Sequence, residues 1–218
     1  MKTFRNFVTV VLVIFVSISS CVNHHEEEPK DLVYEGNAHF SSINKNRFSE
    51  IISNLRGKEV INGKIYVDYY FNGINNVFKT IKKVTGNVIF DGVSQIESFS
   101  FLSNLEEIGG NLEIYNLKDL KNLNGLDKVP KVKSLFFYNN NSALNINAIK
   151  DLEVTNGLKI VGLKEYKIPK FQNISHLKES LSIWDNLAIN DIGFLPNLEK
   201  VDLDIYICLL YTSPSPRD

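Results

Sequence analysis

Two aspartates of the chain have a spacing at which acid–base chemistry could arise. Asp68 and Asp91 each end a short run of aliphatic and aromatic residues, and their positions differ by 23. If the chain repeats with that period, the two carboxyl groups lie side by side, and a carboxylate pair can act as acid and base on a glycosidic bond. A polar residue at a repeated surface position is far more often simply solvated. Catalysis is therefore only a remote alternative.

Other residue types that bind metals or catalyse reactions occur without a supporting pattern. The "HHEEE" stretch from His24 to Glu28 lies in a polar segment that fixes no ligand geometry, so a solvated tether is the better interpretation. His39 and His176 are isolated, and we expect both at the surface or in a cap. Nucleophile motifs and phosphate loops are absent. We therefore expect no metal, no cofactor and no catalytic residue.

A third set of residues is aromatic and could bind a ligand without reacting with it. Aromatic side chains with polar tips suit sugar rings and protein partners, and exposed aromatic clusters often mark binding surfaces. Alternatively, aromatic residues on neighbouring strands stack and stabilise a sheet. Trp184 is the only tryptophan of the chain. The predicted ligand-binding residues are Tyr66, Tyr115, Phe136, Tyr138 and Trp184.

A repeat of about 23 residues must position these side chains. Its unit is an aliphatic residue, a few polar or small ones, and then two aliphatics that flank one variable residue, as in "IGGNLEI" and "VTNGLKI". Such a period predicts a solenoid, in which stacked coils bury their apolar sides against one another. Seven copies have a first strand aliphatic, at steps of 22 to 24 residues: Ile65, Val88, Leu112, Leu135, Leu158, Leu181 and Leu203.

The alternation within each copy predicts a short strand with two side chains inward and one outward. The outward residues should line the exposed surface of one parallel sheet, Val161 among them. A second aliphatic series should close each coil, with Leu117, Leu120, Leu123 and Leu126 in one and Leu187, Ile189, Ile192 and Leu195 in another. Sharp turns are expected at Gly63, Gly86, Gly110 and Gly157. The asparagines 139–141 should make a turn with side-chain hydrogen bonds to the backbone.

The segment "FLSNLEEIGGNLEIYNLKDLKNLNGLDKV" resembles the receptor L-domain family, which is related to leucine-rich repeats. The resemblance extends over 60–207 and implies a right-handed, mainly parallel β-solenoid, although the disulfides of receptor members are absent. Residues 37–59 fit an N-terminal helical cap, which Gly57 can end. Apolar residues recur there at helical spacing: Ile43, Phe48, Ile51, Ile52 and Leu55.

The N-terminus has the pattern of a secretory signal. Residues 1–20 combine Lys2 and Arg5 with a short apolar run, and residues 18–21, "ISSC", resemble a bacterial lipobox. That resemblance implies lipidation of Cys21 and anchoring in a membrane. Residues 21–36 are expected to form a tether, whose acidic cluster resembles the export signal of surface lipoproteins of the Bacteroidota. An ordinary secretory signal with an incidental cysteine is the alternative.

The C-terminal residues 208–218, "CLLYTSPSPRD", lack the rhythm of the repeat. They resemble a translated sequencing adapter, so we expect the natural protein to continue past Ile207. We also expect Cys208 to have no functional role. A genuine tail rich in serine and proline is the alternative. A solenoid without a terminal cap exposes its last coil, and we expect it to self-associate.

Together these patterns predict a non-catalytic lipoprotein exposed on the outer membrane, whose sheet face binds an extracellular glycan or protein. A formal net charge of −1 over 218 residues gives no basic face for a nucleic acid. A structural spacer for a missing C-terminal functional domain is the alternative, and a β-helix enzyme that cleaves polysaccharides is a remote one.

Overall fold

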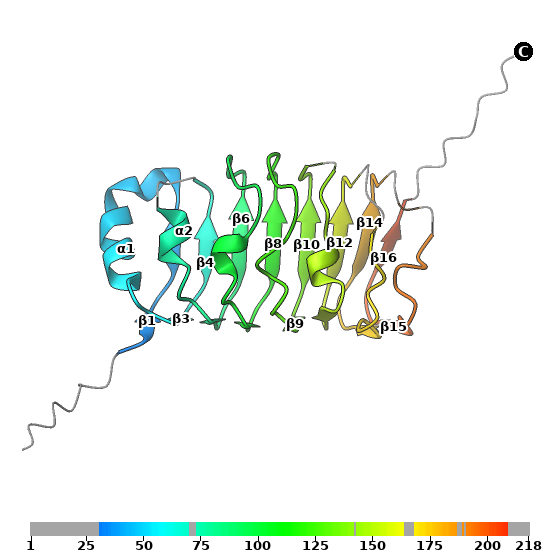
Figure 1. The fold of residues 1–218 in the computed structure, drawn as a ribbon. Helices are drawn as coiled ribbons and strands as arrows, with labels where there is room; N and C mark the ends of the chain where they lie inside the picture. The colour runs from blue at the N-terminus through cyan, green and yellow to red at the C-terminus, as the bar shows by residue number, and fades with distance from the viewer. Residues whose placement is uncertain are drawn as a thin grey trace, which may run out of the picture. The chain divides into compact units, whose positions relative to one another are not determined.

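The computed structural model describes residues 31–69, 73–141, 143–163, 168–186, 189 and 191–208. An eight-stranded parallel sheet runs along one side of these residues (Figure 1). Each strand pairs with the equivalent strand of the next coil, so that Leu135 lies between Leu112 and Leu158. The predicted parallel solenoid is thus confirmed. The strands in spatial order are β2 (Ala38–Phe40), β4 (Ile65–Val67), β6 (Val88–Asp91), β8 (Leu112–Tyr115), β10 (Leu135–Tyr138), β12 (Leu158–Val161), β14 (Leu181–Trp184) and β16 (Ile205–Ile207).

Shorter sheets form a second side of the solenoid. One sheet has the order β1 (Val33–Glu35), β3 (Val60–Asn62), β5 (Lys83–Val84) and β7 (Glu107–Ile108). Two further pairs are β9 (Lys131–Val132) with β11 (Glu153–Val154), and β13 (His176–Leu177) with β15 (Lys200–Val201). Short helices lie away from these strands: α2 (Ile74–Val77), η2 (Ser100–Leu102) and η3 (Asn147–Ile149).

A proline explains the break between β7 and β9. In the preceding coil, the N–H of Glu106, just before β7, donates to the carbonyl of Lys82 at 2.8 Å. Pro130 holds the equivalent position before β9 and has no N–H to donate. The short sheet therefore stops at β7, while the eight-stranded sheet continues past this coil without a gap.

The inward side chains of the eight-stranded sheet form two buried columns. One runs through Ala38, Ile65, Val88, Leu112, Leu135, Leu158 and Leu181, and the other through Phe40, Val67, Phe90, Ile114, Phe137, Ile160 and Ile183. The leucine series from Leu117 to Leu126 closes its coil and is buried, as predicted. Burial of each large apolar side chain contributes about 1.5–3 kcal/mol to the free energy of unfolding. Ile192 was expected inside and is instead exposed.

The last coil corrects one predicted anchor. Leu181 pairs with Ile205 and not with Leu203, which is 61% exposed. In the coil before, Leu181 comes four residues after Leu177 of the short strand, and Ile205 keeps the same distance from Val201. The predicted step of 22 residues from Leu181 to Leu203 is therefore wrong, and the step to Ile205 is 24 residues because the turn between the two strands keeps its length.

The first coil carries a helical cap, as predicted (Figure 1). The cap consists of η1 (Ser42–Arg47) and α1 (Phe48–Leu55), and Gly57 follows α1 with a φ of 74°. Phe48, Ile51 and Leu55 are buried, and the ring of Phe48 meets that of Phe40 at 5.2 Å. Strands β1 and β2 precede this cap, so the sheet begins before residue 60.

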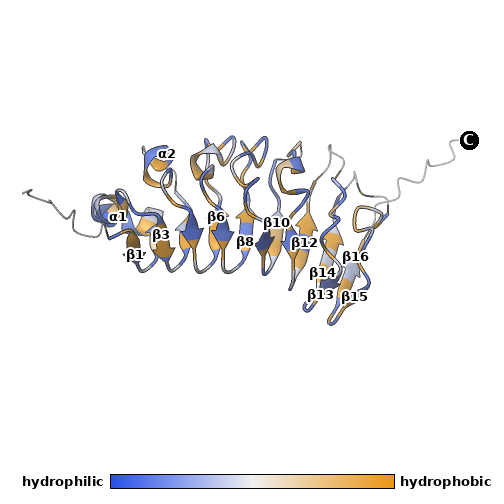
Figure 2. Cartoon of the chain, turned by 60° about the horizontal axis from the view of Figure 1, so that its bottom comes forward, coloured by the Kyte–Doolittle hydropathy of each residue, from blue (hydrophilic) through white to orange (hydrophobic). Residues whose placement is uncertain are grey.

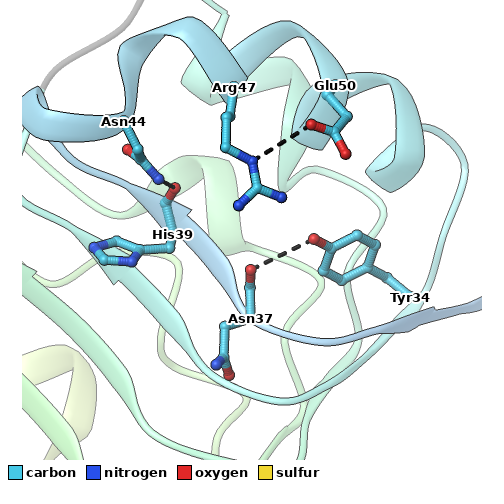
Figure 3. Close-up of polar contacts among 6 residues, drawn as sticks. All are labelled: Tyr34, Asn37, His39, Asn44, Arg47 and Glu50. Atoms are coloured by element: carbon cyan, nitrogen blue, oxygen red, sulfur yellow. Dashed lines mark hydrogen bonds and ion pairs between the residues drawn. The ribbon is translucent and has the colours of Figure 1, made fainter.

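Ile43 does not belong to the buried face of the cap and is 93% exposed. It lies in η1, whose tighter winding does not continue the period of α1. Polar contacts hold this segment on the first coil (Figure 3). The Asn44 amide donates to the carbonyl of His39 in β2 at 2.8 Å. Within the cap, Nε of Arg47 in η1 lies 3.4 Å from a carboxylate oxygen of Glu50 in α1.

Three of the four predicted turn glycines are required by close contact between coils. A Cβ at Gly63 would lie 2.1 Å from the carbonyl oxygen of Gly36, and one at Gly86 would lie 2.7 Å from that of Gly63. A Cβ added at Gly110 would lie 2.2 Å from Oδ1 of Asn87. Gly157 has more room, since its nearest neighbour is Oε2 of Glu179 at 3.3 Å.

Two buried asparagines join neighbouring coils, as predicted for the turn around residue 140. Asn140 accepts a hydrogen bond from the Leu117 N–H at 2.9 Å and donates one to the Ile114 carbonyl at 2.8 Å. Asn186 holds the equivalent position two coils later, with the Leu163 N–H at 2.8 Å and the Ile160 carbonyl at 2.7 Å. Each amide therefore satisfies two buried backbone groups that the sheet leaves unpaired.

Substitution of Gly63 should test the contact between coils. We expect Gly63→Ala to lower the free energy of unfolding by about 1–3 kcal/mol, because the added carbon must push backbone aside. Gly157→Ala is the matched control and should change it by less than about 1 kcal/mol, since only the tip of a glutamate is close. Urea unfolding followed by circular dichroism measures both, and equal losses would contradict the explanation.

Asn140→Ala should also destabilise the solenoid, by about 1–3 kcal/mol, because it leaves a buried N–H and a buried carbonyl without partners. Asn124→Ala removes an exposed amide and should stay within about 0.5 kcal/mol of the wild type. The same urea unfolding experiment compares them. If Asn124→Ala lowered the free energy of unfolding as much as Asn140→Ala, the hydrogen bonds that Asn140 makes to the neighbouring coil would not be the cause of the loss.

Candidate functional site

The candidate site is the sheet face, which we define as the outward side chains at the second and fourth positions of the strands of the eight-stranded sheet. Hydrophilic and hydrophobic stretches both occur along these strands (Figure 2). The half from β2 to β8 carries charged and phenolic groups, whereas the half from β10 to β16 carries most of the aromatic surface. The five predicted binding residues all lie on this face but are divided between the halves.

Glu113 organises the polar half. Its carboxylate accepts hydrogen bonds from the Tyr115 hydroxyl at 3.0 Å and from the amides of Asn87 and Asn111, both at 3.1 Å. Burial raises the pKa of Tyr115 well above its usual range, and the negative charges of Glu113 and Asp91 raise it further. Tyr115 is therefore a neutral hydrogen-bond donor that helps to hold this carboxylate in place.

The two aspartates considered for catalysis both link neighbouring coils. Asp68 accepts hydrogen bonds from the Ser41 hydroxyl at 2.8 Å and from the Ser42 N–H at 3.0 Å. Asp91 accepts one from the Asn116 amide at 2.8 Å. These hydrogen bonds to neighbouring coils support a structural role for both aspartates.

Tyr66 lies beside these carboxylates and not beside the other predicted aromatic residues. Its ring meets that of His39 edge to face, with the ring centroids 4.7 Å apart. Burial raises its pKa, and the charges of Asp68 and Asp91 add to the effect. Tyr66 and Tyr115 thus belong to the polar half.

The aromatic half brings Tyr138 and Trp184 together. Their rings meet at 6.0 Å with an angle of 62°, although the two residues come from strands two coils apart. Val161 lies between them in register on β12 and is only 3% exposed. We predicted Val161 at the surface, and this is wrong because the two large rings close over it. Phe136 lies half-buried on the same strand as Tyr138.

A hollow of about 640 Å³ adjoins Trp184 at the end of the sheet face. Its lining consists of Ser182, Trp184, Asp185, Tyr206, Ile207 and Cys208. Tyr206 was not among the predicted binding residues, although the anchor Leu203 would also place it at an outward position, the fourth of its strand. Its pairing with Ser182 shows that it holds the second position. The distance from Val201 to Ile205 was the signal for this register.

The rim of the sheet face follows a column of left-handed residues. The residue after each of five consecutive strands has a positive φ, between 53° and 83°: Gly92, Asn116, Asn139, Gly162 and Asp185. Glycine, asparagine and aspartate are the residues that accept this conformation most readily. The turn therefore sets the position from which Asp185 reaches the hollow.

The structure gives less support to other kinds of site. Within the described residues no three His, Cys, Asp or Glu side chains come together as metal ligands. No helix of the described ranges is long and apolar enough to span a membrane. The predicted signal peptide, Cys21, His24 and His25 lie outside the described residues, as does the tail after Cys208.

The raised pKa of Tyr115 predicts a pH-dependent stability. In the unfolded chain a tyrosine ionises near pH 10, whereas the folded protein holds Tyr115 neutral, so its contribution is present below pH 10 and is lost as the pH rises further. Tyr115→Phe should therefore cost about 1 kcal/mol at pH 9 and less at pH 11. Urea unfolding at both values measures this, and an unchanged difference would contradict the assignment.

Comparison with known proteins agrees with this architecture. No curated protein and no solved structure matches the chain with significance. The family model described as "Receptor L domain" matches residues 35–153, which is more than half of the 218 residues. The match begins at the end of β1 and extends into β11, and it therefore includes the first coil and its cap. The chain belongs to the receptor L-domain family.

Proposed function

We propose that this protein is a lipid-anchored receptor of the cell surface, whose sheet face binds an extracellular glycan or protein without catalysis. Receptor L domains are a family of non-enzymatic binding modules. The scaffold of the sheet face is rigid, because buried columns and side-chain hydrogen bonds join its coils. A rigid surface loses little conformational freedom when it binds.

The exposed aromatic cluster is the observation that carries this proposal. Trp184 is 37% exposed although it is the largest side chain of the chain, and Tyr138 holds its ring from one side. Tryptophan and tyrosine are the residue types that most often dominate binding energy at protein surfaces. Lys159 adds a cation 5.3 Å from the centroid of the Tyr138 ring, so the cluster combines apolar area with a donor.

Location at the membrane is supported by the N-terminal sequence. Residues 18–21 resemble a lipobox, and the acidic tether after Cys21 resembles a surface-export signal. Diacylation of the thiol and acylation of the new amine would give several chains, which is enough for stable anchoring. We therefore place the sheet face outside the cell, at the end of a tether long enough to hold it off the membrane.

Cys21→Ala should release the protein from the membrane fraction into the soluble fraction, because the lipid can no longer be attached. Cys208→Ala is the matched control and should stay with the membrane, since its exposed thiol takes no part in anchoring. Fractionation of cells that express each full-length variant, followed by immunoblotting, measures the distribution. Retention of Cys21→Ala in the membrane would contradict lipidation at this residue.

Trp184→Ala and Tyr138→Ala should weaken binding at least tenfold. Each also removes the ring contact over Val161 and should lower the free energy of unfolding by about 0.5–1.5 kcal/mol, but the protein should stay folded because the buried columns are unchanged. Ile192→Ala removes an exposed apolar side chain away from the sheet face and should bind as the wild type does. The probes are an array of bacterial and animal glycans and a parallel panel of immobilised extracellular matrix proteins. A wild type that binds neither panel would favour the spacer alternative.

A further inference from the structure

We propose that Asn124 is a site of spontaneous deamidation, in which the protein backbone supplies the nucleophile and the carboxylate of Asp127 slows the reaction. The backbone nitrogen of Gly125 attacks Cγ of Asn124, and the new C–N bond closes a five-membered succinimide ring. The side-chain nitrogen leaves as ammonia, which takes up the proton that the Gly125 nitrogen loses. Water then opens the ring at either carbonyl, so that residue 124 becomes aspartate or isoaspartate.

An asparagine followed by a glycine is well suited to this ring closure. The nucleophile and the amide carbon belong to neighbouring residues, so no second molecule has to be brought into place, and glycine has no Cβ that would hinder the approach. Four such pairs occur in the chain, and they begin at Asn62, Asn72, Asn124 and Asn156. Asn72 lies outside the described residues, and the surroundings of the other three differ.

The side chain of Asn62 is fixed at both ends of its amide. Its Nδ2 donates to the Glu35 carboxylate at 2.7 Å, and its Oδ1 accepts a hydrogen bond from the Thr85 hydroxyl at 3.1 Å. These partners belong to the two neighbouring coils, and the backbone of Asn62 also pairs with that of Glu35 in the short sheet. Ring closure would require both side-chain hydrogen bonds to break, so the fold protects this site.

Asn156 is protected in the same way. Its Nδ2 donates to the Glu179 carboxylate at 2.9 Å, and its Oδ1 accepts a hydrogen bond from the Thr155 hydroxyl at 3.1 Å. The nucleophile is engaged as well, because the N–H of Gly157 donates to the buried Ser134 hydroxyl at 3.2 Å. Both groups that must meet are therefore held by other partners.

Asn124 lies in a turn, and its side chain is exposed. Its backbone N–H donates to Oδ1 of Asn122 at 3.0 Å, but its side-chain amide has no hydrogen-bond partner among the described residues. An exposed side chain without such a bond changes rotamer on the picosecond to nanosecond timescale. The amide carbon of Asn124 can therefore approach the Gly125 nitrogen without first breaking a hydrogen bond of the side chain.

The contact between Gly125 and Asp127 opposes the reaction at this site. The N–H of Gly125 donates to Oδ1 of Asp127 at 3.1 Å. The Gly125 nitrogen must lose its proton to react, and both the hydrogen bond and the negative charge of Asp127 disfavour that loss. Asp127 is exposed and only two residues away, so water readily replaces this contact. Asp127 therefore slows the reaction without preventing it.

The two products should differ in their effect on the solenoid. Isoaspartate carries the backbone through its side-chain carbons, so it adds one carbon to the chain just before Gly125. Gly125 has little room to move, since even a Cβ there would lie 1.9 Å from the carbonyl oxygen of Phe99, and the adjacent Leu123 and Leu126 are fully buried. Isoaspartate should therefore loosen the contact between these two coils, whereas aspartate leaves the backbone unchanged.

Trypsin separates the three sites, which makes them internal controls for one another. Cleavage after lysine releases Asn124 in peptide 122–128, Asn62 in peptide 59–64 and Asn156 in peptide 151–159. The full-length protein is incubated at mildly alkaline pH, digested at intervals and analysed by mass spectrometry, with fragment spectra that assign each deamidation to a residue. We expect Asn124 to react at least about tenfold faster than the other two, because each of those must first lose two side-chain hydrogen bonds.

The same protein unfolded in guanidinium chloride tests whether the structure causes this difference. Without the fold, the three rates should agree within about threefold, since all three sites share the Asn-Gly sequence. A folded protein in which Asn124 reacts no faster than Asn62 and Asn156 would overturn the proposal. A difference of equal size in guanidinium chloride would overturn its structural explanation.

Asp127→Ala should speed the deamidation of Asn124 by at least about threefold, because the change removes both the hydrogen bond and the negative charge. Glu199→Ala removes an exposed carboxylate in another coil and is the matched control, which should react at the rate of the wild type. An unchanged or slower reaction in Asp127→Ala would overturn the role of Asp127.

Asn124→Ala tests the effect on the solenoid, because an alanine cannot close the ring. The wild type should unfold at a lower urea concentration after incubation than before it, whereas the midpoint of Asn124→Ala should stay constant through the same incubation. An equal decrease in both proteins would show that isoaspartate at 124 is not the cause.

Discussion

The spacing between neighbouring parallel strands, about 4.8 Å, is the constraint on which the structure depends. Each coil of the described residues must lie at this distance from the next across the whole sheet, so every repeat position contacts its own equivalent one coil away. An inward position therefore keeps one character along the solenoid. Aliphatic side chains fill the inward columns, and no side chain at all is tolerated where Gly63 and Gly86 bring two backbones together. Where the backbone ladder leaves groups unpaired, an asparagine such as Asn140 supplies both missing partners.

The same stacking divides the sheet face by chemistry. In the half near the cap, hydrogen bonds such as Ser41 to Asp68 and Asn116 to Asp91 run from coil to coil, so the polar groups there are engaged with the scaffold itself. In the other half four of the outward side chains are aromatic, and the contact between Tyr138 and Trp184 leaves part of the Trp184 ring exposed. The proposed recognition surface therefore lies where the scaffold makes the least use of its own side chains. The asymmetry arises from the residues and not from the backbone, which is equivalent in both halves.

The period, the inward columns from Ile65 to Leu181 and the capping helix were predictable, because each depends on a pattern local to one coil. What could not be predicted depends on neighbours in other coils or on equal alternatives. Val161 is buried only because the side chains one coil to either side happen to be a tyrosine and a tryptophan. Leu203 and Ile205 are both aliphatic and two residues apart, so alternation alone cannot choose between them. The pairing of Tyr138 with Trp184 across an intervening strand, and with it the position of the hollow, likewise requires the three-dimensional stack.

The left-handed column at the rim of the sheet has a consequence for how such a surface can diversify. Glycine adopts this backbone conformation without a penalty, and asparagine and aspartate have a smaller penalty than most residues. Only these three residue types occur at the five rim positions Gly92, Asn116, Asn139, Gly162 and Asp185. Substitutions along this edge are thus largely limited to three residue types. Glycine presents no side-chain group, asparagine presents an amide, and aspartate presents a carboxylate. Positively charged and large apolar groups are disfavoured there on backbone grounds alone. New specificities that need them must arise within the strands, where the extended backbone accepts nearly any residue.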